Sequence, residues 1–124
     1  MNGGFHLLHT FFAVISVLCF LVCISAFIRS TYFLQHLPFL NLSRIQHVSL
    51  AILCCICAFL HGILATPSPA SISGKLAWML LLLLIVFAFP LQKKKSRLWK
   101  KIHRTLSVIT FVLISVHILH AILT

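Results

Sequence analysis

The sequence of 124 residues contains no aspartate and no glutamate, although it contains ten lysines and arginines. Without carboxylates, most hydrolytic enzymes and sites for divalent cations are excluded, unless a partner supplies the missing groups. Charged residues make up only 8% of the chain, whereas hydrophobic residues make up 61%. This balance excludes an ordinary soluble domain and predicts a membrane protein.

All five cysteines lie inside apolar runs, where cysteine commonly acts as a small hydrophobic residue. We therefore expect no disulfide framework. The Cys-Cys-x-Cys cluster at residues 54–57 has no loop that could shape tetrahedral coordination, so a metal site is the weaker interpretation there. The cysteines are Cys19, Cys23, Cys54, Cys55 and Cys57.

Four apolar runs predict membrane-spanning helices at about residues 5–28, 44–65, 75–91 and 99–123. The segment 29–43, with Pro38, predicts a connection on the membrane surface, and TPSPASISG at residues 66–74 predicts a turn. The predicted fold is all-α, a single four-helix membrane domain that covers residues 1–124.

The basic residues predict the orientation of these helices. Seven of the ten lie between Lys93 and Arg104, Arg29 and Arg44 flank the first loop, and Lys75 alone lies on the opposite side. By the positive-inside rule both termini face outward and the basic loops are cytoplasmic. The predicted location is a bacterial inner membrane. The charge is thus a topology signal, and we expect no nucleic acid as a partner.

The second and fourth runs each carry two histidines that are 14 positions apart, His47 with His61 and His103 with His117. At about 100° per residue, 14 steps return a side chain to within about 40° of its starting direction. The two histidines are also about 21 Å apart along the helix axis. In a hydrocarbon core of about 30 Å, each helix therefore offers one histidine to each leaflet.

Helices two and four run in the same direction, which places His47 level with His103 and His61 level with His117. Two histidine pairs at different depths predict two b-type haems between these helices, each with two imidazole ligands. Such haems transfer electrons. The alternative is that each imidazole bonds a neighbouring helix as polar glue.

Basic residues near the inner histidine pair are candidates for binding the haem propionates, although they also fit a simple positive-inside charge excess. They are Arg44, Lys100, Lys101 and Arg104. His6, His9 and His120 lie at the outer end and are weaker candidates around an acceptor or a quinone head group, because interfacial histidines are easily accommodated.

Three segments carry a resemblance to a known family: RIQHVSLAILCCICAFLHG, the glycine of SISGKLAWMLLLLLIVFAFP, and SRLWKKIHRTLSVITFVLISVHILH. Over about residues 44–124 the sequence resembles the ferric-reductase-type transmembrane domain, and its histidine spacing is similar to that of the dihaem helices of cytochrome b. The resemblance implies that His47 and His103 hold the inner haem, and that His61 and His117 hold the outer haem.

No GxGxxG loop occurs in the sequence, so we expect the chain not to take hydride from NADPH itself. The predicted function is a cytochrome that moves electrons across a membrane from a quinol or flavin-type donor to an acceptor at the outer face. The alternative is a small electron-transfer or anchoring subunit of a larger redox complex. Partners are membrane lipid and a redox protein or quinone.

Overall fold

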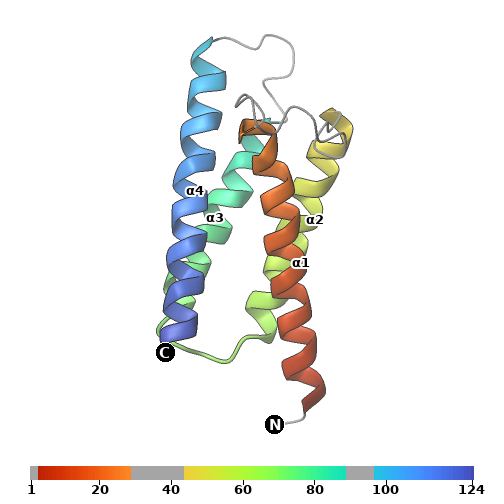
Figure 1. Cartoon of the computed structure of the whole chain (residues 1–124), viewed down its shortest axis with the longest axis vertical. Helices are drawn as coiled ribbons and strands as arrows, with labels where there is room; N and C mark the ends of the chain where they lie inside the picture. Colours follow the sequence, from red (N-terminus) through yellow and green to blue (C-terminus); the bar gives the residue numbers. More distant parts are fainter. Residues whose placement is uncertain (1–2, 29–43, 89–96) are drawn as a thin grey trace. The chain divides into compact units, whose positions relative to one another are not determined.

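The computed structural model of the protein describes residues 3–28, 44–88 and 97–124. It contains four α-helices: α1 (Gly3–Ile28), α2 (Arg44–Leu64), α3 (Ser71–Ala88) and α4 (Arg97–Leu123) (Figure 1). Each helix is long and apolar enough to cross a membrane, as expected of a multi-pass integral membrane protein. The predicted all-helical fold with four such helices is confirmed.

The start of α3 differs from its prediction. The prediction of a turn through Gly74 is wrong, because α3 begins at Ser71 and not at Lys75. Ser71 N–H donates to the carbonyl of Ser68 at 2.9 Å, and Gly74 N–H donates to that of Ala70 at 3.2 Å. Serine favours helix starts as well as turns, so this composition fits either structure. The predicted surface connection at 29–43 lies outside the described residues.

The chain divides into two compact units, Met1–Leu64 and Ala65–Thr124. In the first unit α1 packs against α2, and in the second α3 packs against α4. Each unit is thus a helical hairpin, and we refer to them as the first and the second hairpin. The single domain and the four-helix bundle of all four helices stay predictions.

Most hydroxyl groups of the helices bond to a carbonyl of the same helix. Thr10 donates to His6 O, Thr105 to Lys101 O and Thr110 to Leu106 O, at 2.8–2.9 Å. In a hydrocarbon environment there is no water to satisfy a polar side chain, so a bond to the preceding turn is the available solution. The hydrogen bonds of these hydroxyl groups are therefore those expected in the hydrocarbon core of a membrane.

Small residues let α3 and α4 approach closely. The buried residues of α3 follow a spacing of three and four positions, which places them on one face of the helix. Ala70 and Gly74 continue this face toward the N-terminus of α3, and small side chains at such positions let helix backbones come near each other in membranes. The buried residues of this face are Ala70, Ala77, Leu81 and Leu84.

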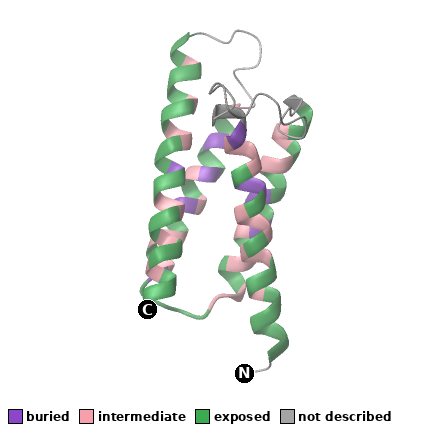
Figure 2. Cartoon of the chain, in the orientation of Figure 1, coloured by how far each residue is buried: buried purple, intermediate pink, exposed green. Residues whose placement is uncertain are grey.

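Figure 2 shows that exposed residues cover long faces of all four helices. Many of these are large apolar side chains, including Phe11, Phe59 and Ile122. In water such faces would aggregate, whereas in a bilayer lipid chains cover them. The exposed apolar side chains and the length of the helices therefore both indicate helices that span a membrane.

Candidate functional site

The four histidines of the predicted haem sites lie within continuous helices. His47 and His61 both lie in α2, and His103 and His117 both lie in α4. The position midway between each pair is deeply buried: Cys54 is 2% exposed and Thr110 is 0% exposed. Because seven residues make almost two full turns, each midpoint lies on the same face as its two histidines. The face that bears the histidines is therefore a packed face in both helices.

In the first hairpin this face of α2 contacts α1 at three levels. His61 meets His9, the Cys54 thiol donates to the carbonyl of Ser16 at 3.2 Å, and the Cys23 thiol lies 3.8 Å from the carbonyl of His47. The residue numbers of the contacting positions fall on α1 as they rise on α2. The two helices are thus antiparallel, and all three contacts follow one register.

His61 is held by His9 in two ways. The two imidazole rings stack with centroids 4.2 Å apart and planes inclined by 29°. Nδ1 of His61 also lies 3.4 Å from the carbonyl oxygen of His9. Because a carbonyl oxygen only accepts, Nδ1 carries the proton in this bond, and the lone pair of the ring is then on Nε2.

His117 is held by the first turn of α3. Its Nδ1 lies 3.0 Å from the carbonyl oxygen of Ala70 and 3.1 Å from Oγ of Ser73. Oγ of Ser73 donates to the same carbonyl at 2.8 Å, so the serine proton is directed at Ala70. Nδ1 is therefore the protonated nitrogen of His117 as well, and Nε2 carries the lone pair.

Two glycines near the candidate ligands have different surroundings. At Gly74 a Cβ atom would lie 2.8 Å from Cε1 of His117. At Gly62, which follows His61 in α2, a Cβ atom would meet no described heavy atom within 4 Å other than those of its chain neighbours and of the nearby backbone of α2. The ring of His117 thus occupies space that only a glycine leaves open at position 74.

At the other end of α4, the ring of His103 stacks on the indole of Trp99. The ring centroids are 5.2 Å apart and the planes are inclined by only 10°. Nε1 of Trp99 donates to the carbonyl of Phe87 in α3 at 3.4 Å. The indole therefore connects His103 to the last turn of α3.

The basic candidates near His103 lie on the surface of α4. Lys100, Lys101 and Arg104 are all exposed. Arg44 is the first residue of α2, and its side chain lies outside the described residues, as do Lys93 to Lys95. The structure therefore leaves the role of these groups as a prediction.

The predicted grouping of His6, His9 and His120 around an acceptor or a quinone head group stays a prediction, because His120 belongs to the other hairpin. The rings of His6 and His9 are 6.5 Å apart, and His9 stacks on His61. Within the described ranges, no group of three or more histidines and cysteines could hold a metal ion. An axially ligated haem needs only two protein side chains, because the porphyrin binds the iron equatorially, so the haem prediction is not tested by this finding.

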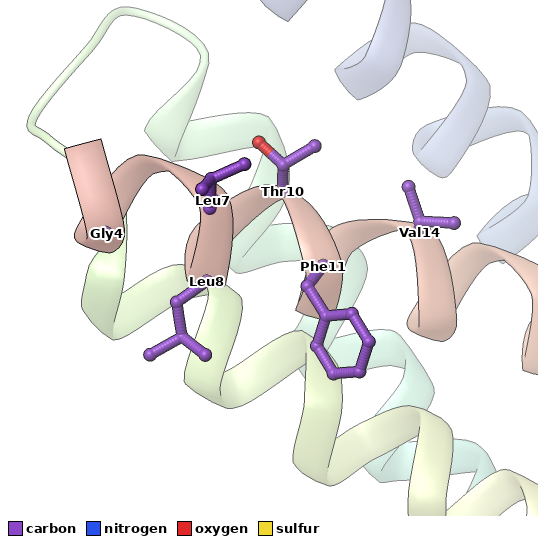
Figure 3. Close-up of a pocket in the computed structure, with 6 residues that line it drawn as sticks. All are labelled: Gly4, Leu7, Leu8, Thr10, Phe11 and Val14. Carbon is purple, nitrogen blue, oxygen red and sulfur yellow. The ribbon is translucent and has the colours of Figure 1, made fainter.

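A shallow hollow runs along α1 (Figure 3). All six residues that line it belong to this one helix, and its surface is almost entirely apolar. A hollow on one side of a single helix cannot surround a ligand, so it fits a lipid-facing surface. Its lining residues are Gly4, Leu7, Leu8, Thr10, Phe11 and Val14.

Comparison of the chain with protein-family models, with curated proteins and with solved structures finds no match.

The contacts of the candidate ligands within each hairpin were not predicted from the sequence. The predicted topology places His61 and His9 toward the same side of the membrane. This shared depth is the signal in the sequence for their contact. The Ala70 carbonyl gave no signal, because a backbone group is present at every residue. The pairing of His47 with His103, and of His61 with His117, stays a prediction.

Proposed function

We propose that this protein is a dihaem b-type membrane cytochrome that moves electrons across a membrane, and that its transmembrane domain is of the ferric-reductase type. The observation that carries the proposal is the repeated interval of 14 residues on two membrane-length helices. Ionisable residues inside a membrane are costly, so a doubled arrangement at corresponding depths needs a reason.

The residues of the two hairpins fit axial ligation. His61 directs Nδ1 to a carbonyl oxygen of α1, and His117 directs Nδ1 to the carbonyl of Ala70, the residue just before α3. Histidine ligands generally donate their second ring nitrogen to such an acceptor, which fixes the tautomer and the orientation of the ring. Nε2 would then be the ligating atom of both residues.

We assign His61 and His117 to an outer haem and His47 and His103 to an inner haem. A haem with two imidazole ligands supplies one-electron transfer and leaves no open position on the iron. The chain contributes the four imidazoles, the hydrogen bonds that fix His61 and His117, and cationic groups for the propionates at Arg44, Lys100, Lys101 and Arg104. The sequence has no acidic side chain that could compete for these cations.

The donor in this proposal is a quinol or a flavin-type reductase, and the acceptor lies at the outer face. The basic loops are cytoplasmic, both termini are outside, and the membrane is a bacterial inner membrane. The 124 residues contain no dinucleotide-binding loop, and the proposed source of electrons is a separate redox protein or a quinol. The alternative is an electron-transfer subunit of a larger redox complex, because the chain needs a redox partner in either case.

A helical scaffold without haem is the competing function, and a specific observation favours it. The bond of His61 to α1 and the bond of His117 to the residue that precedes α3 are those that polar glue requires. The two functions share these bonds, because the glue uses Nδ1 and ligation uses Nε2. Only a measurement of bound haem separates them.

The test is a haem titration of the chain purified from cells that are well supplied with haem. We expect reduced-minus-oxidised bands of low-spin haem b and about two haems per chain. Replacement of His47 or His103 by alanine should remove the inner haem, and replacement of His61 or His117 should remove the outer one. His120→Ala is the control, since His120 is rotated by about 100° from the ligand face of α4, and it should retain both.

A folded, colourless protein would overturn the proposal and leave the scaffold. Unchanged haem content in all four histidine variants would overturn the assignment of these histidines as ligands. Co-purification of a stoichiometric redox protein with a haem-loaded chain would assign the subunit role, whereas turnover of the isolated chain with quinol or reduced flavin would assign the stand-alone role.

A further inference from the structure

We infer that Gly74 is a positioning residue for His117, through which it maintains the outer haem site. The part that concerns haem rests on the proposed function. The contact between Gly74 and the His117 ring is a property of the second hairpin by itself, so it is tested separately.

The position of Gly74 calls for a specific reason to retain glycine. It lies within the regular helix α3, where glycine is less favourable than alanine because its backbone loses more conformational entropy on forming a helix. Its backbone has no positive φ angle, so conformation does not require glycine. What requires it is the neighbouring ring: a Cβ atom would lie 2.8 Å from Cε1, 3.2 Å from Nδ1 and 3.3 Å from Nε2 of His117.

The ring of His117 cannot move aside without losing its other contacts. Nδ1 is bonded to the carbonyl of Ala70 at 3.0 Å, and Oγ of Ser73 lies at 3.1 Å. Ala70 is only 2% exposed, so this carbonyl belongs to the packed interface. A methyl group at position 74 would therefore displace the ring, weaken the bond that fixes the tautomer and crowd the side of the ring that includes Nε2.

The chain offers a matched control in Gly62. This glycine also lies in a membrane-length helix and is adjacent to a candidate outer ligand, His61. A Cβ atom there would meet nothing within 4 Å among the described residues. Gly62→Ala and Gly74→Ala add the same methyl group, but only the second adds it against an imidazole.

The first measurement is a double-mutant cycle on the full chain, prepared without haem in lipid bilayer discs. Gly74→Ala should lower the folded-to-unfolded ratio by about tenfold, as overpacking usually does. In the His117→Ala background the same change should cause no loss, because the ring that it meets is absent. Gly62→Ala should cause no loss in either background.

The second measurement is haem content together with the electron paramagnetic resonance spectrum of the low-spin haems. Gly74→Ala should remove the outer haem or shift its signal and leave the inner signal unchanged, whereas Gly62→Ala should change neither.

Equal losses of stability for Gly74→Ala in both backgrounds would overturn the steric contact with His117. A Gly74→Ala chain that folds only when His117→Ala is also present would support the contact. A Gly74→Ala chain that fails to fold in both backgrounds would overturn it.

A confirmed contact with unchanged haem spectra would overturn the role of Gly74 in positioning the haem site. Absence of haem from the unsubstituted chain would instead overturn the proposed function, while the cycle would still report on the contact.

Discussion

The two hairpins hold corresponding histidines by different means. In the first, His61 stacks on a second imidazole, His9, at 4.2 Å and approaches the carbonyl of the same residue at 3.4 Å. In the second, His117 bonds the Ala70 carbonyl at 3.0 Å and lies against Gly74. The first arrangement depends mainly on the identity of a side chain, whereas the second depends on a backbone group and on the absence of a side chain.

This difference teaches which substitutions each hairpin tolerates. Removing the His9 side chain abolishes the ring contact of His61 but leaves the carbonyl in place. No substitution removes the Ala70 carbonyl, so the contact of His117 is disturbed only by adding atoms near it. The first hairpin should thus be sensitive to truncation and the second to enlargement.

The largest expected effects come from overfilling the packed middle of each hairpin, beginning here with the second. Thr110 is 0% exposed, so Thr110→Leu should lower the free energy of unfolding by about 1–3 kcal/mol. Val112→Leu, at an exposed position of the same helix, is the control and should have little effect. Denaturant unfolding in mixed detergent micelles measures both. Equal stabilities would show that the histidine face of α4 is not the packed face.

Introducing leucine at the midpoint of the first hairpin sharpens the comparison. Cys54→Leu enlarges a residue that is 2% exposed and also removes the thiol bond to Ser16. It should lower the free energy of unfolding by at least as much as Thr110→Leu, since two effects combine. A much smaller loss would indicate that the two packed faces are not equivalent.

A smaller effect is expected from truncation at the stacked rings of the first hairpin. His9→Ala removes the stack with His61 and should lower the free energy of unfolding by about 0.5–1.5 kcal/mol, the range of aromatic pairs. His9→Phe keeps a stacking ring and should recover most of this loss. His6→Ala is the control, because the His6 and His9 rings are 6.5 Å apart. Equal effects of His9→Ala and His6→Ala would show that the stack of His9 on His61 does not contribute to the free energy of unfolding.

Much of the fold follows from the sequence. Long apolar runs fix four helices of spanning length, because the backbone in a bilayer must satisfy its own hydrogen bonds. The start of α3 was misjudged, since serine and glycine in SISG are compatible with both a turn and a first helical turn. Gly74 belongs to a segment that carries the family resemblance, but the sequence could not predict its contact with His117.

The sequence by itself determined the helices, the 14-residue intervals and the common face of each histidine pair, because helical periodicity is a local property of the chain. Only the tertiary structure decided that His61 meets His9 and that His117 meets the Ala70 carbonyl beside Gly74. Such contacts depend on the register between two antiparallel helices. That register is set by close packing of small residues and by backbone acceptors, which have no distinctive letter in the sequence.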